Sequence, residues 1–115
     1  MGILQPPFQF SLVMGVLGGI PASTKNLLHQ VEQLPDNSFW QVIGIGTKQW
    51  PLVAAALTLG GNVRVGLEDN LYLPNGELAK SSAEGVETAV TLANLTGVPV
   101  ATVAEAREKL QIPRR

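Results

Sequence analysis

Three apolar segments, each followed by a glycine-containing turn and then by helical periodicity, most constrain how this chain can fold. The segments are Phe8–Gly15, Phe39–Ile45 and Asn62–Glu68. Apolar strands that alternate with helices at this spacing predict a parallel sheet covered by helices. We expect an α/β fold of three consecutive βα units, with the first strand buried on both faces.

The first two helices have clear boundary residues. Ser23 suits the cap of a helix whose apolar positions, including Leu27, Leu28 and Val31, recur at three- and four-residue spacing until Pro35 ends it. Pro51 suits the first turn of a second helix. Both predicted helices follow a strand, as a βα unit requires.

Two further helices are predicted beyond the third strand. One runs from about Ser82 to Leu95 and the other is a short terminal helix at Val103–Leu110. Ser81 with Glu84, and Thr102 with Glu105, have the spacing of capping boxes at their starts.

The length of the chain leaves two architectures open. A closed (β/α)8 barrel needs about 250 residues, whereas this chain has 115. It is either a small open α/β domain or the C-terminal part of a (β/α)8 TIM-type barrel. Because no linker or charge run marks a boundary, we expect residues 1–115 to form one domain, a partial one in the second case.

Composition excludes several classes of partner and site. The net charge is −1, with no cysteine and one histidine, so no basic surface for nucleic acid and no thiolate metal site is expected. The first 24 residues carry no charge, but they lack the basic start of a signal peptide, and Gly18, Gly19 and Pro21 interrupt any spanning helix. We expect a cytoplasmic protein without a membrane partner.

The segment Arg64–Asn70 carries the sharpest chemical pattern. Alternation in a strand places Arg64 and Glu68 on one face, with the gap of Gly66 between them, and Val63, Val65 and Leu67 on the other. Catalytic groups of barrel enzymes lie at the carboxyl ends of strands, where Glu68, Asp69 and Asn70 are expected. The long Arg64 side chain is expected to pass Gly66 and reach Asp69. The alternative is an internal ion pair that only stabilises the fold.

The turns after the first two strands have the glycines that a close anion requires. Gly18, Gly19 and Gly46 would let backbone amides approach a phosphate at a helix start, although glycine also serves tight βα turns without a ligand. His29 lies off the apolar face of its helix and is expected at the surface. Tyr72, beyond Asp69, is the aromatic residue best placed to line a pocket.

Three ordered motifs carry a resemblance to a known family. They are the first strand with Gly18-Gly19-Ile20-Pro21-Ala22, the segment Val42-Ile43-Gly44-Ile45-Gly46, and Gly60-Gly61-Asn62-Val63-Arg64-Val65-Gly66-Leu67-Glu68-Asp69-Asn70. From Phe8 to about Leu110 the chain resembles the β-keto acid cleavage enzymes, typified by 3-keto-5-aminohexanoate cleavage enzyme.

The resemblance implies a zinc-dependent (β/α)8 barrel that converts a β-keto acid and acetyl-CoA into acetoacetate and a new acyl-CoA. It implies that Glu68 is a zinc ligand and that Arg64 and Asp69 act on water and on the reacting carbon. Asp69 beside Arg64 is expected to stay ionised as a base. Gly18, Gly19, Gly46 and Asn70 are candidate contacts to the substrate or to CoA.

The family's His-x-His zinc pair has no counterpart here, since the single histidine is His29. We therefore expect weak zinc binding and no activity from this chain alone. Two classes of function stay open: part of an enzyme that needs an N-terminal half-barrel, and a silent structural or assembly module. In both cases we expect the edge strands of the sheet to pair with another chain or with a second copy of this one.

Overall fold

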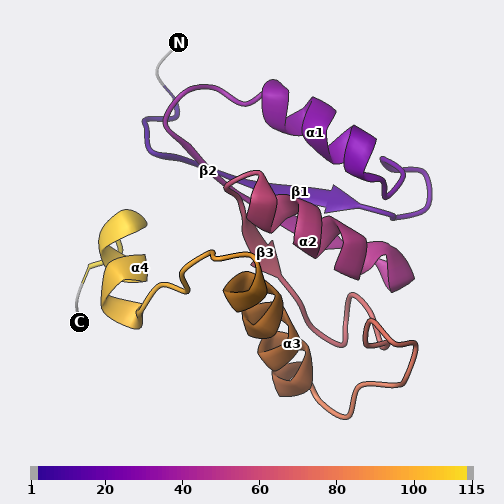
Figure 1. The fold of residues 1–115 in the computed structure, drawn as a ribbon. Coiled ribbons are helices and arrows are strands. Elements are labelled where there is room, and N and C mark those ends of the chain that lie inside the picture. The colour runs from indigo at the N-terminus through magenta and orange to yellow at the C-terminus, as the bar shows by residue number, and fades with distance from the viewer. Residues whose placement is uncertain (1–2, 114–115) are drawn as a thin grey trace.

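The computed structural model describes residues 3–113 and has an α/β fold around one parallel sheet (Figure 1). The strands are β1 (Phe8–Met14), β2 (Ser38–Gly44) and β3 (Asn62–Arg64). Their order is β1-β2-β3, so β2 is central and each outer strand has one neighbour within residues 3–113. No helix in this part of the chain is long and apolar enough to cross a membrane.

Within residues 3–113, four α-helices accompany the sheet, which confirms three βα units followed by a terminal helix. They are α1 (Thr24–Glu32), α2 (Gln49–Thr58), α3 (Ser82–Leu95) and α4 (Val103–Lys109). A short 3-10 helix, η1 (Gly46–Lys48), precedes α2. In Figure 1, α4 lies apart from α1 and α2, beyond the end of α3.

The helix caps follow the sequence signals with one exception. Ser23 Oγ accepts a hydrogen bond from the Asn26 amide, and Thr102 with Glu105 forms a complete capping box. Ser81 caps α3 through the Glu84 amide, but the Glu84 carboxylate accepts from the Lys80 amide instead of from Ser81. The predicted capping box at Ser81 is therefore only half formed.

The core lies on the face of the sheet that the helices cover. Leu12, Met14 and Val42 point from the strands into a cluster with Leu27 of α1 and Leu52 of α2. A second cluster, between α2, α3 and β3, contains the buried residues Trp50, Val53, Leu57, Ala89 and Ala93, with Val63 and Val65 packed against it. Burial of these side chains is the main force that holds the helices to the sheet.

The opposite face of the sheet is open and partly polar. Along β1, Gln9, Ser11 and Val13 are exposed while the residues between them are partly or fully buried. The expectation of a first strand buried on both faces is therefore wrong, because helices cover one side only. On the open face, Gln41 Nε2 donates to Ser11 Oγ at 2.9 Å across paired positions of β2 and β1.

The third strand is shorter than predicted. It ends at Arg64, whereas alternation was expected to continue to Glu68. The chain turns because the Gly66 carbonyl accepts hydrogen bonds from the amides of Asp69, at 3.1 Å, and Asn70, at 3.2 Å. Glu68 consequently lies in a turn and not in a strand.

Leu28 of α1 also differs from its prediction, which placed it on the apolar face of the helix. Its side chain is exposed, although its spacing from Leu27 and Val31 placed it on the apolar stripe of α1. A stripe of a helix that packs on one side only is narrow, and Leu28 lies at its edge.

Candidate active site

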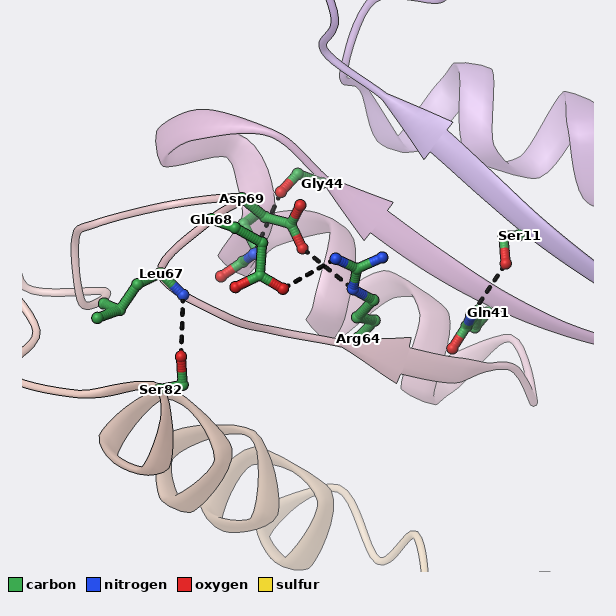
Figure 2. A network of polar contacts seen from close by, with 9 residues as sticks. Ser11, Gln41, Gly44, Arg64, Leu67, Glu68, Asp69 and Ser82 are labelled. Atoms are coloured by element: carbon green, nitrogen blue, oxygen red, sulfur yellow. Dashed lines mark hydrogen bonds and ion pairs between the residues drawn. The ribbon is translucent and has the colours of Figure 1, made fainter.

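Arg64 brings two carboxylates together beyond the end of β3. Its Nη2 lies 2.8 Å from Glu68 Oε1, and its Nε lies 3.4 Å from Asp69 Oδ2 (Figure 2). The predicted proximity of Arg64, Glu68 and Asp69 is thus present. The structural alternative needed either of these ion pairs, and both are present, so the pairs alone do not distinguish catalysis from stabilisation.

Glu68 reaches Arg64 by a route that alternation did not predict. The turn at Gly66 folds the Glu68 side chain back, and a Cβ added to Gly66 would lie 2.7 Å from the Glu68 carboxyl carbon. The space left by Gly66 is therefore filled by Glu68 and not by the Arg64 stem. Val65 and Arg64 still point to opposite sides, since Val65 packs against the helix cluster.

Asp69 and Glu68 have different surroundings although they are adjacent in sequence. The Asp69 side chain is 7% exposed and that of Glu68 is 59% exposed. Within residues 3–113, Asp69 Oδ2 has no hydrogen-bond partner. A buried carboxylate without a hydrogen bond to this oxygen has lost water contacts that the ion pair replaces only in part.

The two carboxyl groups accordingly shift in opposite directions. Burial raises the pKa of Asp69, Arg64 opposes that rise, and the negative charge of Glu68 adds to it, so the net pKa is above the ordinary value. The hydrogen bond from Arg64 lowers the pKa of Glu68. We expected Arg64 to dominate at Asp69; burial outweighs it.

The backbone around Asp69 is held from two sides. Its amide donates to the Gly66 carbonyl at 3.1 Å, and its carbonyl accepts from the Gly46 amide at 2.8 Å. Leu67, in the same turn, donates to Ser82 Oγ at the start of α3 at 3.2 Å (Figure 2). The turn is therefore tied to the loop after β2 and to α3.

Asn70 organises the loop that follows. Its Nδ2 donates to the Tyr72 carbonyl at 2.7 Å, and its Oδ1 accepts from the Tyr72 amide at 3.1 Å. Trp50 Nε1 donates to the same Tyr72 carbonyl at 2.7 Å. Asn70 is buried, so these bonds anchor the loop to α2, and the role of Asn70 as a substrate or CoA contact stays a prediction.

Two of the three glycines of the predicted anion turns, Gly19 and Gly46, donate their amides to backbone carbonyls. The Gly19 amide donates to the Val16 carbonyl at 2.9 Å, and the Gly46 amide donates to Asp69. An anion at either amide would have to replace these bonds. Contacts of Gly18, Gly19 and Gly46 with substrate or CoA stay predictions.

The described residues do not form a complete metal site. Within residues 3–113, no group of three or more histidine, cysteine, aspartate or glutamate side chains is placed to hold a metal ion. Glu68 is one carboxylate, whereas catalytic zinc normally takes three protein ligands. His29 is exposed on α1, as predicted.

Three side-chain contacts near the site were missed by sequence reasoning. The sequence predicts Ser82 only as the start of a helix, and sequence reasoning gave no contact to Trp50, to Gln41 or to Ser11. A usable signal existed for Trp50, because a buried indole N–H requires an acceptor.

The chain is similar to known proteins over almost its whole length. The sequence model of the family described as beta-keto acid cleavage enzyme matches residues 1–112. The chain is 46% identical over 113 residues to the 3-keto-5-aminohexanoate cleavage enzyme of Acetoanaerobium sticklandii, covering 98% of this chain and 41% of that protein. It is 42% identical to the enzyme of that name from Fusobacterium nucleatum, over 98% of this chain and 41% of the relative.

A third relative is named for a different reaction. It is the 3,5-dioxohexanoate:acetyl-CoA acetone transferase of Paraburkholderia graminis, 40% identical over 96% of this chain and 37% of the relative. The chain thus spans about two-fifths of the length of these curated relatives, at 41%, 41% and 37%.

Proposed function

This chain belongs to the beta-keto acid cleavage enzyme family, and we propose that it supplies part of the active site of an acetyl-CoA-dependent β-keto acid cleavage enzyme. The observation that supports this most is the Arg64 guanidinium between exposed Glu68 and buried Asp69. A buried base beside a cation, beyond the carboxyl end of a strand, is a common arrangement for proton transfer in parallel α/β enzymes.

The proposed reaction transfers an acyl group to CoA. The carbon–carbon bond between the keto carbon and the carboxymethyl group of a β-keto acid breaks, and the acyl part passes to CoA. The carboxymethyl carbon joins the acetyl group of acetyl-CoA, which gives acetoacetate. Acetyl-CoA is part of the names of two relatives, the 3,5-dioxohexanoate:acetyl-CoA acetone transferase and the 3-dehydrocarnitine:acetyl-CoA trimethylamine transferase, which supports acetyl-CoA as the co-substrate here.

Asp69 is the proposed base. As a carboxylate it accepts a proton from the substrate or from an intervening water, and its raised pKa makes it a stronger base than an exposed aspartate. Arg64 holds the charge of Asp69 in place and restrains Glu68 on the open side of the turn. The negative charge of Asp69 would also favour a substrate that carries a cationic amine.

A complete site needs residues beyond those described. We propose that the chain corresponds to the C-terminal part of a (β/α)8 barrel and that Glu68 supplies one ligand of a zinc ion whose other ligands lie elsewhere in such a barrel. Zinc would polarise the keto group there. Residues 3–113 contain no group of three or more histidine, cysteine, aspartate or glutamate side chains that could hold the ion without those further ligands.

A chimera tests the proposed function. The segment of the Acetoanaerobium sticklandii relative that matches this chain is replaced by this chain, and acetoacetate formation from acetyl-CoA and 3-keto-5-aminohexanoate is followed. Activity in the chimera that Arg64→Met removes, and that the surface change His29→Ala leaves intact, would support the proposal. A folded, zinc-loaded chimera without activity on any β-keto acid would favour the silent structural module instead.

A further inference from the structure

Asn75 is the only asparagine of the chain that is followed by glycine. The pair Asn75-Gly76 lies in the turn of a small hairpin, in which Tyr72 and Leu78 form an antiparallel bridge. Both residues of the pair are exposed. The Asn75 side chain and the amide that follows it are therefore in contact with water.

The residue after an asparagine controls how easily the asparagine side chain reacts with the backbone. The next backbone nitrogen attacks the side-chain carbonyl carbon, and a side chain on that next residue obstructs the approach. Gly76 carries none, its φ is +86°, and a Cβ added there would meet no atom within 4 Å. Five of the six asparagines instead precede a residue with a side chain, namely Leu27, Ser38, Val63, Leu71 and Leu95.

Three hydrogen bonds hold the pair in the closed turn. The Gly76 amide donates to the Leu73 carbonyl at 2.9 Å. Asn75 Oδ1 accepts from the Glu77 amide at 3.1 Å, and Asn75 Nδ2 donates to Glu77 Oε2 at 3.0 Å. Hydrogen bonds in an exposed turn open more readily than those of the core. The turn therefore slows the attack of the Gly76 nitrogen but leaves it possible whenever the turn opens.

We propose that Asn75 is a site of spontaneous deamidation in the folded chain. When the turn opens, the Gly76 nitrogen loses its proton and forms a bond to Asn75 Cγ, the Cγ–Nδ2 bond breaks, and ammonia leaves. Water then opens the resulting succinimide ring at one of its two carbonyl carbons, which leaves aspartate or isoaspartate at position 75. Water is the only co-reactant, so this inference does not depend on the proposed function.

Deamidation would replace an attraction within the hairpin by a repulsion. Asn75 Nδ2 donates to the Glu77 carboxylate, whereas the product would place a second carboxylate against it, and like charges repel. Isoaspartate would also lengthen the backbone by one carbon and displace the acceptor of the Glu77 amide. The Leu73 amide, which donates to the Glu77 carbonyl at 2.8 Å, should then lose protection because the hairpin opens.

Peptide mapping by mass spectrometry tests the proposal on the 115-residue chain. The folded chain is incubated at mildly alkaline pH, where the attacking amide loses its proton more often, and is digested at intervals. The peptide that contains Asn75 should gain one dalton before any peptide that contains a different asparagine. A parallel sample denatured in guanidinium measures the reaction without the turn.

Gly76→Ala separates the chemistry of the pair from the stability of the turn. Alanine at this positive φ strains and loosens the turn, but its Cβ obstructs the attack, so the reaction at Asn75 should become slower. Gly60→Ala is the matched control. Gly60 has a φ of +81°, and its added Cβ would also meet no atom within 4 Å, so the strain is comparable and the rate at Asn75 should not change.

A second pair of variants tests the effect on the hairpin. Asn75→Asp should accelerate hydrogen exchange of the Leu73 amide, because it places the new carboxylate against Glu77. Adding Glu77→Gln to that variant should restore protection, since the glutamine amide can donate to the carboxylate at position 75. Unchanged exchange of the Leu73 amide in Asn75→Asp would overturn the opening of the hairpin.

The deamidation site itself is contradicted by any of three results. Asn75 that stays intact in the folded chain while it reacts in guanidinium would show that the turn protects the pair. Earlier reaction at another asparagine, such as Asn37 before Ser38, would place the site elsewhere. An unchanged rate at Asn75 in Gly76→Ala would show that the absence of a side chain at Gly76 does not control the reaction.

Discussion

Glu68 Oε1 lies 2.8 Å from Arg64 Nη2, although Glu68 belongs to a turn and Arg64 is the last residue of a strand. The contact exists because the chain reverses at Gly66, and the missing side chain of Gly66 leaves space for the returning carboxylate. Three consecutive features, a strand end, a glycine and a turn, therefore build the ion pair.

Gly66→Ala should break this ion pair while the fold persists. The new Cβ would lie 2.7 Å from the Glu68 carboxyl carbon, and the flexible, exposed Glu68 side chain would move away. The pKa of Glu68, which the hydrogen bond from Arg64 now lowers, should rise toward its ordinary value. NMR titration of the Glu68 carboxyl group measures the change.

Gly85→Ala is the control for the change at Gly66. A Cβ at Gly85 would meet only Val65, at 3.8 and 3.9 Å, which are ordinary contact distances. Because Gly85 lies inside α3, alanine there should stabilise the chain by about 0.5–1 kcal/mol and leave the Glu68 pKa unchanged. An unaltered Glu68 pKa in Gly66→Ala would contradict this account of the turn.

Asp69 should make the stability of the chain depend on pH in a direction unusual for an aspartate. Its folded pKa is raised, so the folded state binds this proton more tightly than the unfolded state does. Its contribution to stability is full below the ordinary aspartate pKa of about 3.9 and is lost as pH rises through the folded pKa. Urea unfolding of wild type and Asp69→Asn across pH measures this difference.

Glu68→Gln should show the opposite trend. The folded pKa of Glu68 is lowered, so its contribution to stability is present above the ordinary glutamate pKa of about 4.3 and disappears as pH falls through the folded pKa.

The Asp69→Asn series can contradict this account. If the stability of wild type relative to Asp69→Asn increased with rising pH, the assignment of burial as the larger effect on the Asp69 pKa would be wrong.

The sequence predicted the order and type of the elements because apolar periodicity and caps are local signals. Asn62–Arg64 was recognised as a strand, but its end was placed four residues too late. Alternation of Val63, Val65 and Leu67 looks the same in a strand as in the first residues of a tight turn. The hydrogen bonds to Gly66 that end the strand depend on the turn that follows.

The site residues were found from a short charged motif, but their electrostatics were not. Proximity of Arg64 and Asp69 was inferred from spacing, whereas the burial of Asp69 depends on how the turn packs against its surroundings. The contact from Gly46 to Asp69 joins residues of two βα units. A pattern along one sequence carries no direct signal for such a contact.

Asn70→Ala should destabilise the chain by about 1–3 kcal/mol, because it would leave the Tyr72 amide without its acceptor and remove one of the two donors to the Tyr72 carbonyl. Urea unfolding followed by tryptophan fluorescence measures the loss. The fluorescence of Trp50 should also change, since its indole N–H shares the Tyr72 carbonyl.

Asn75→Ala is the matched control for Asn70. Asn75 Oδ1 likewise accepts from the amide two positions on, that of Glu77, but Asn75 Nδ2 donates to the Glu77 carboxylate at an exposed turn. Its loss should change stability by less than about 0.5 kcal/mol. Equal effects of the two substitutions would show that Asn70 does not anchor the loop.

The purified chain should associate in solution. Among residues 3–113, β1 and β3 each have a neighbour on one side only, and the open face between them exposes Val13. Unpaired strand edges pair readily with another chain. Light scattering should show oligomers at micromolar concentration, whereas a compact monomer with cooperative unfolding would favour a small open α/β domain over a part of a barrel.

The rate of acetoacetate formation by the chimera carrying Asp69→Asn tests the central claim most directly. Asparagine keeps the size of the side chain but cannot accept the proton, so the rate should fall by about 10²–10⁴-fold, the usual contribution of a general base. Acetyl-CoA binding and the folded fraction should stay unchanged. A rate within about threefold of the unsubstituted chimera, far below the contribution expected of a general base, would contradict the assignment of Asp69 as the base.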